Sequence, residues 1–98
     1  MDTSNDFESF KTEATKQGFD EVLERVWAPA AVIPSHGHPF AVKALIAAGE
    51  MWLTVGDQIR HLRTGDEFTL ASGELHAERY GEKGATLWAA RRHAAGAS

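Results

Sequence analysis

The chain has 98 residues, a net charge of −4 and no cysteine. This length suits one domain with a modest core, and the absence of cysteine excludes disulfides, thiol catalysis and cysteine-bound metal clusters. The acidic balance, the lack of a membrane-length apolar stretch and an acidic N-terminus without a signal-peptide core predict a cytoplasmic protein with no nucleic-acid or membrane partner.

The first predicted element is a short helix in the segment NDFESFKTEATKQG. Phe7, Phe10 and Ala14 recur at the spacing of one helical stripe. A polar residue just before Phe7 can cap the helix, and Gly18 is suited to ending it. We therefore expect residues 1–18 to form an N-terminal helical extension.

Short strands separated by turn residues are predicted after the helix. The segment FDEVLERVW alternates apolar and polar residues, and VKALIAAGEMWLTV indicates two strands around Gly49. The pair Gly56-Asp57 is typical of a tight hairpin turn, and further glycine turns follow at Gly65 and Gly73. One helix followed by roughly seven or eight short strands predicts an all-β sandwich, jelly roll or barrel. We expect the barrel to span residues 19–92 and residues 93–98 to form a flexible tail.

Two histidines in the segment PSHGHPF form the first candidate site. On a strand, residues two apart share a face, so the imidazoles of His36 and His38 would project side by side and could bind one ion. A third histidine, His76, follows the glycine turn at Gly73 and lies near a strand start. Three histidines on one interior face would form an open metal site. The alternative is that the imidazoles are wall residues of a metal-free domain.

The spacing of these residues resembles the two motifs of the cupin superfamily. The first motif, G-x5-H-x-H-x3/4-E-x6-G, is matched by His36, His38, Val42 and Gly49, and the second, G-x5-P-x-G-x2-H-x3-N, by Gly65, Ala71, Gly73, His76 and Tyr80. The resemblance implies a double-stranded β-helix, a jelly-roll cupin barrel preceded by a short helix. It also implies that His36, His38 and His76 are metal ligands.

The chain departs from these motifs at several positions. Val42 replaces the usual glutamate ligand, and Lys43 is expected to point outward. Alanine replaces the usual glycine at position 30 and the usual proline at position 71, and Tyr80 replaces an asparagine. The metal site would thus lack one of its usual four protein ligands.

A carboxylate on the strand HAERY is the candidate replacement. His76, Glu78 and Tyr80 share a face of this strand, which would place Glu78 inside the barrel. A buried carboxylate is costly unless it is paired or bound to a metal. Glu78 is therefore a candidate fourth ligand, a group that holds a metal-bound water, or a general base. Alternatively, a bulge turns Glu78 to solvent. Tyr80 either hydrogen-bonds a ligand in the barrel mouth or forms part of the buried wall.

The resemblance implies two kinds of function. One is a metal-dependent enzyme of the dioxygenase, isomerase or decarboxylase class, which holds Fe, Mn, Zn or Ni and acts on a small polar substrate, with Glu78 and Tyr80 as catalytic candidates. The other is a non-catalytic cupin that senses or binds a small ligand, without a metal in one version.

The remaining polar and aromatic residues are interpreted as surface or core. His61 and His93 are expected to be exposed, as are the arginines at positions 60, 63, 79, 91 and 92. If Met51 and Leu53 point inward, Trp52 points outward, and its large apolar ring would be exposed to solvent unless other side chains bury it. We therefore expect a homodimer with Trp52 and Leu45 in the contact.

Overall fold

The structure, a computed structural model, describes residues 6–93. Its first element is helix α1, Phe7–Lys16, as the sequence predicted. Asp6 caps the helix, and its side-chain Oδ1 accepts a hydrogen bond of 2.7 Å from the backbone N–H of Ser9. The side chain thereby satisfies one of the amide groups left unpaired at a helix start.

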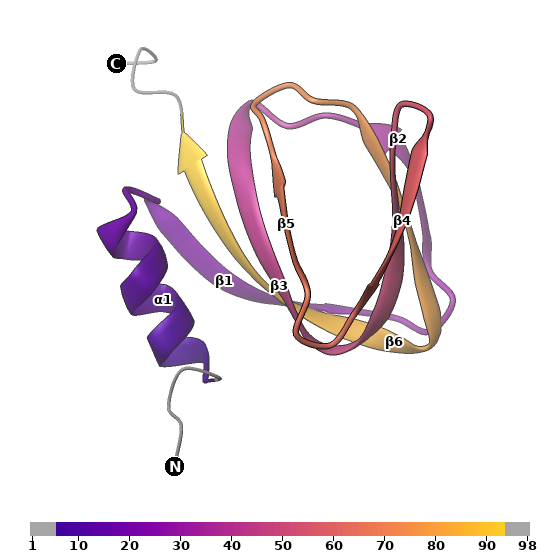
Figure 1. Ribbon diagram of the computed structural model, residues 1–98, viewed down its shortest axis with the longest axis horizontal. Helices are drawn as coiled ribbons and strands as arrows, with labels where there is room; N and C mark the ends of the chain where they lie inside the picture. Colours follow the sequence, from indigo (N-terminus) through magenta and orange to yellow (C-terminus); the bar gives the residue numbers. More distant parts are fainter. Residues whose placement is uncertain (1–5, 94–98) are drawn as a thin grey trace.

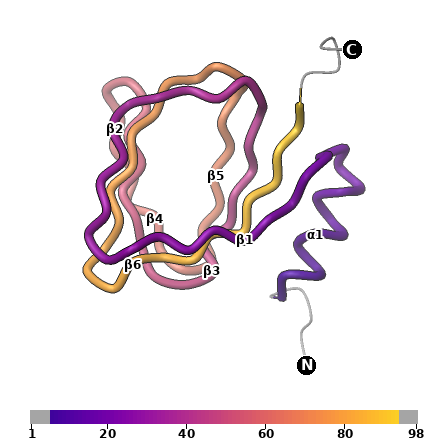
Figure 2. The backbone as a smooth tube through the Cα atoms, turned by 180° about the vertical axis from the view of Figure 1, so that it is seen from behind, coloured from indigo at the N-terminus to yellow at the C-terminus, as the bar shows by residue number. Residues whose placement is uncertain are grey.

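All strand pairs within the described residues are antiparallel, in the order β1-β6-β3-β4, with β2 on β6 and β5 on β3. Figures 1 and 2 show these strands curling into a barrel, with α1 lying outside it beside β1. The strands are β1 (Glu21–Trp27), β2 (Val32–His36), β3 (Phe40–Val55), β4 (Gln58–Arg63), β5 (Glu67–Leu70) and β6 (His76–His93).

The expected break at Gly49 is a bend inside one long strand, β3, which pairs with β6 along most of its length. The prediction of two separate strands here was wrong because the register shifts on either side of Gly49 without ending the ladder. Gly49 has φ +79°, and a Cβ there would lie 2.2 Å from the carbonyl oxygen of Gly84. Glycine thus permits both the bend and the close crossing of β3 and β6.

The first-motif position occupied by Ala30 has a conformational reason to favour glycine. Ala30 has φ +58°, the left-handed region that glycine adopts without steric cost and that alanine seldom adopts. The turn between β1 and β2 is therefore kept despite the substitution, because the Ala30 N–H donates to the Gly81 carbonyl at 2.9 Å.

Helix α1 covers the outer face of the sheet formed by β1, β6 and β3. Phe10 and Ala14 are buried against Ala90, and Leu45 and Trp88 pack around them. Burying an apolar side chain of phenylalanine size contributes about 1.5–3 kcal/mol. On the same outer face, the Lys43 Nζ donates a hydrogen bond of 2.8 Å to the side chain of Gln17. Lys43 therefore points away from the barrel interior, as predicted.

The barrel interior holds the main hydrophobic core. Its most buried members come from β3 and β6, which lie side by side in the barrel wall as an antiparallel pair. The buried core residues are Ala44, Ile46, Met51, Leu53, Leu62, Phe68, Leu70, Tyr80, Ala85 and Leu87. This apolar packing leaves one end of the interior to polar side chains, which form the site described next.

The ends of the expected domain fall partly outside the described residues. The structure places His93 in β6 as its last residue. Residues 1–5 and 94–98 of the expected extension and tail lie outside the described residues. Within residues 6–93, no helix is long and apolar enough to cross a membrane.

Candidate metal centre

Three histidines from two segments of the chain meet at one end of the barrel interior. His36 is the last residue of β2, and His76 is the first residue of β6 and its direct partner in the ladder. His38 lies just beyond β2, in the connection to β3. One ring nitrogen of each histidine lies within 4.8 Å of those of the other two. The convergence predicted from the sequence is therefore present.

Backbone carbonyls set the orientation of two of these rings. The Nδ1 atom of His36 lies 2.8 Å from the carbonyl oxygen of Pro34, and Nδ1 of His76 lies 3.0 Å from that of Glu74. Because a carbonyl can only accept, each Nδ1 carries the hydrogen, and in the neutral ring Nε2 keeps a free lone pair. Metal-ligating histidines commonly donate their other N–H in this way, so the donor set fits a divalent transition metal.

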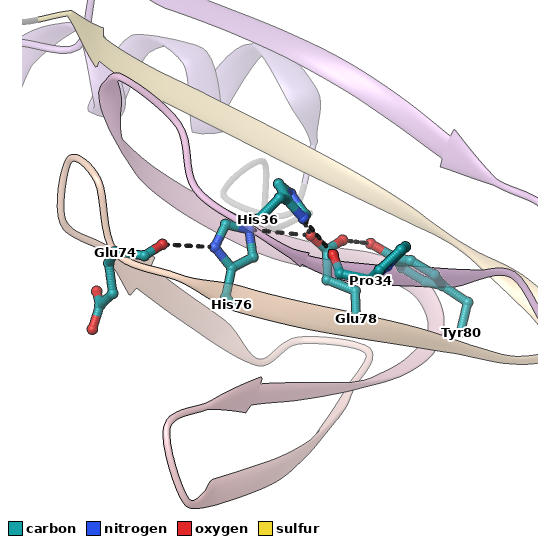
Figure 3. Close-up of polar contacts among 6 residues, drawn as sticks. All are labelled: Pro34, His36, Glu74, His76, Glu78 and Tyr80. Carbon is teal, nitrogen blue, oxygen red and sulfur yellow. Dashed lines mark hydrogen bonds and ion pairs between the residues drawn. The ribbon is translucent and has the colours of Figure 1, made fainter.

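Glu78 extends into the same space, as the strand periodicity predicted. Its side chain is only 10 % exposed, and its Oε2 lies 3.3 Å from Nε2 of His76 and 3.7 Å from Nε2 of His36. Figure 3 shows the carboxylate between the two imidazoles and Tyr80. The alternative in which a bulge turns Glu78 to solvent is wrong, because β6 stays in regular register against β3 from Ala77 to Tyr80.

Tyr80 is buried in the hydrophobic core and holds Glu78 in place. Its ring stacks on that of Trp27 with centroids 5.0 Å apart, and its hydroxyl donates to Oε1 of Glu78. Burial, and then the hydrogen bond to Glu78, raise the pKa of Tyr80 well above its usual range. The tyrosine therefore remains a protonated donor, and it leaves the second oxygen of Glu78 facing the histidines.

The surroundings of His38 favour its neutral form. Burial, and then the positive charge that His36, His76 and Arg91 can carry, lower the pKa of His38, while Glu78 acts in the opposite direction. Only the neutral imidazole can bind a metal. A lowered pKa therefore favours the form of His38 that can act as a ligand.

The cavity beside the histidines has a volume of about 100 Å³. Val42 lines it, so an apolar side chain occupies the position of the usual glutamate, and the carboxylate enters from β6 instead. Its lining residues are Arg25, Trp27, His36, His38, Phe40, Val42, Ala44, Phe68, Leu70, His76, Glu78, Leu87, Ala89 and Arg91.

Two arginines of this lining, Arg25 and Arg91, were missed by the sequence reasoning. Arg91 was expected on a solvated face, which is wrong because its side chain lines the cavity and is only 23 % exposed. The signal was present in the sequence: Arg91 has the same strand parity as Leu87 and Ala89, and Arg25 that of Trp27.

The other histidines lie away from the centre. His61 bonds Oε1 of Glu50 at 2.6 Å and stacks on Trp52 with centroids 4.5 Å apart. Arg79 covers the Trp52 ring at 4.1 Å, and His93 contacts Glu21. Both histidines are exposed, as expected.

The two side chains named for the dimer contact are covered within the chain itself. Trp52 lies between His61 and Arg79, and Leu45 packs beneath α1. The reason given for a homodimer therefore loses its support, and the homodimer stays a prediction.

A barrel of antiparallel strands with three histidines converging at one end of its interior defines a cupin, the double-stranded β-helix that the motif spacing indicated. The chain belongs to the family of AraC-like ligand-binding domains, which it matches over residues 18–88. A comparison with curated proteins finds no match.

Solved structures show the same fold. A protein of unknown function from Rhizobium leguminosarum bv. viciae 3841 has a TM-score of 0.70 at 14% identity, covering 74% of this chain and 69% of that one. An RmlC-like cupin from Shewanella frigidimarina NCIMB 400 has a TM-score of 0.66 at 16% identity, covering 83% and 73%. The DMSP lyase DddQ from Ruegeria pomeroyi DSS-3 has a TM-score of 0.64 at 27% identity, covering 76% of this chain but 37% of the lyase.

Proposed function

We propose that this cupin holds a divalent transition metal on His36, His38 and His76 and acts as a metal-dependent enzyme on a small polar substrate. The observation that carries the proposal is the convergence of one ring nitrogen from each histidine within 4.8 Å. Crowded neutral imidazoles gain little from this arrangement by themselves, whereas a bound cation would make use of all three.

Glu78 favours proton-transfer chemistry, as in the isomerase class, over the dioxygenase and decarboxylase classes. A bound metal would act as a Lewis acid that polarises a substrate oxygen. Glu78 is placed to accept a proton beside it, because one carboxylate oxygen faces the histidines while Tyr80 holds the other. A general base must lie within hydrogen-bond reach of the proton that it takes, and the small cavity brings a substrate to that position. The similarity to a protein described as a DMSP lyase supports an enzymatic role.

The second candidate function is non-catalytic binding or sensing of a small ligand. The match to the AraC-like ligand-binding domain family favours it. In that case the histidines and Glu78 would bind the ligand without turning it over. The two candidates differ in whether the ligand is turned over, and one version of the second needs no metal.

Metal analysis of protein purified without a chelating tag tests the proposal. We expect one transition metal ion per chain after incubation with Fe²⁺, Mn²⁺, Zn²⁺ or Ni²⁺ and removal of the excess. Retained zinc or nickel would support Lewis-acid chemistry, whereas selective retention of iron or manganese would point to the dioxygenase class. If none of the four ions is retained, the metal-dependent function is wrong and the metal-free ligand-binding function takes its place.

A further inference from the structure

Two arginine side chains line the same cavity as the three histidines. Arg25 lies on β1 and Arg91 lies on β6, and these two strands pair with each other. Both side chains face the barrel interior, where they line the cavity. Both residues are half-buried. The cavity wall therefore carries two fixed positive charges in addition to the histidines.

Most N–H donors of these two guanidinium groups make no hydrogen bond within residues 6–93. The Arg25 guanidinium lies over the Trp27 ring at 4.9 Å and makes no hydrogen bond or ion pair with any residue of the described range 6–93. Arg91 lies over the Phe40 ring at 4.8 Å, and its one polar contact within that range is a long one of 3.4 Å to Oε1 of Glu21. Since a guanidinium has five N–H donors, most of them are free to bind a ligand.

The charge of the cavity favours an anion. Among the lining residues, Glu78 is the one acidic group, against the cations Arg25 and Arg91. The carboxylate of Glu78 is already engaged by the Tyr80 hydroxyl and lies against the histidines. A divalent metal on neutral imidazoles would add further positive charge to the lining. A negatively charged ligand near the two arginines would balance that charge.

The size of the cavity and the shape of the arginine side chain narrow the ligand further. A volume of about 100 Å³ lies well below the roughly 300–1,000 Å³ of pockets for drug-sized ligands. The planar guanidinium forms paired, parallel hydrogen bonds with a carboxylate. Apolar side chains such as Phe40, Phe68 and Leu70 line other parts of the cavity. They offer no hydrogen bonds to hydroxyl groups, so they disfavour an extensively hydroxylated ligand.

We propose that the ligand of this cavity is a small organic acid that is held by its carboxylate charge at Arg91 and Arg25 while an oxygen group faces the histidines and Glu78. The orientation toward the histidines rests on the proposed metal function, but the binding of the carboxylate by the arginines does not. The two arginines are then the residues that select an acidic substrate over a neutral one.

Calorimetric titration with malonate tests this proposal, using zinc-loaded and metal-free protein. We expect Arg91→Gln and Arg25→Gln each to weaken malonate binding at least tenfold, because each loses a charge-assisted pair. The neutral isostere malonamide should bind the wild type at least tenfold more weakly than malonate and should not distinguish the variants.

Arg92→Gln is the matched control, since Arg92 follows Arg91 on β6 but points to the outer face, where it donates to the backbone carbonyl of Gln17. It removes the same charge and should leave malonate binding unchanged. Zinc content should stay the same in all three variants. Equal malonate affinity of Arg91→Gln and the wild type would overturn the proposal, as would tighter binding of inorganic phosphate than of malonate.

Failure of the metal function would be visible separately. If the wild type retains no zinc, the loss of malonate affinity in Arg91→Gln should still appear in metal-free protein and would support the carboxylate site alone. If zinc is retained but millimolar malonate does not bind, the acid specificity is wrong and the metal function stands.

Discussion

The His76→Ala variant is expected to lose on the order of a hundredfold in affinity for a divalent metal. His76 brings the most buried of the three imidazoles, with a side chain 2 % exposed, and its Nδ1–H donates to the Glu74 carbonyl, which directs Nε2 toward the other histidines. If a binding free energy of about 10 kcal/mol is shared over four ligands, each ligand accounts for roughly 2–3 kcal/mol. Isothermal titration of the variant and the wild type with Zn²⁺ measures the loss.

Thermal unfolding separates this loss from a general defect in folding. A metal at a hundredfold excess over its Kd stabilises the wild type by about 2.7 kcal/mol, and at about 4–8 °C per kcal/mol the melting temperature should rise by roughly 10–20 °C. His76→Ala should lose this rise while both proteins unfold similarly in chelator, apart from the cost of the cavity. His61→Ala, which removes an exposed imidazole stacked on Trp52, should keep the full rise. An equal rise in His76→Ala and the wild type would contradict the shared site.

The second large effect is expected for Glu78→Gln, which should weaken metal binding by about 10–100-fold. The substitution keeps the shape of the side chain and an oxygen that accepts from Tyr80, but removes the charge that lies 3.3 Å from Nε2 of His76. Loss of that charge takes away either a ligand or the acceptor for a metal-bound water. Zinc competition against a chromophoric chelator measures the change.

Glu82→Gln is the control for the carboxylate, because Glu82 lies four residues farther along β6 and is exposed. It should bind zinc like the wild type. Tyr80→Phe keeps the ring that stacks on Trp27 and removes only the hydroxyl bond to Glu78, so its effect on zinc affinity should be smaller than that of Glu78→Gln. If Glu78→Gln and Glu82→Gln bind zinc equally well, the inward carboxylate has no role at the metal.

Local patterns in the sequence predicted much of the fold and of the candidate site. The cap before Phe7 and the apolar stripe of α1 are local, and so is the alternation that turns Glu78 inward beside His76. The two histidine motifs predicted which residues meet because their spacing is set by the barrel, and the structure brings the three histidines together.

The remaining features depend on contacts between distant segments, which local patterns do not contain. Gly49 was interpreted as a break because its signal is the same for a loop and for a bend, and only the crossing of β6 at Gly84 distinguishes them. Trp52 was assigned to a dimer contact, whereas the cover comes from Arg79 on β6 and His61 on β4.

The cavity arginines were missed for the same reason. An arginine in an alternating strand is usually solvated, so the strand parity that Arg91 shares with Leu87 and Ala89 was outweighed. The pairing of β6 with β1 and β3 shows that this face is the inward one. Within the family motif no position corresponds to it, so the resemblance did not point to it either.

Diffraction from crystals of the zinc-loaded protein, measured at the zinc absorption edge, shows whether the three histidines share one metal ion. We expect one anomalous peak per chain about 2.0–2.1 Å from a ring nitrogen of each of His36, His38 and His76. A zinc-loaded crystal with no peak between these three rings, or with a peak bound by fewer than two of them, would contradict this expectation.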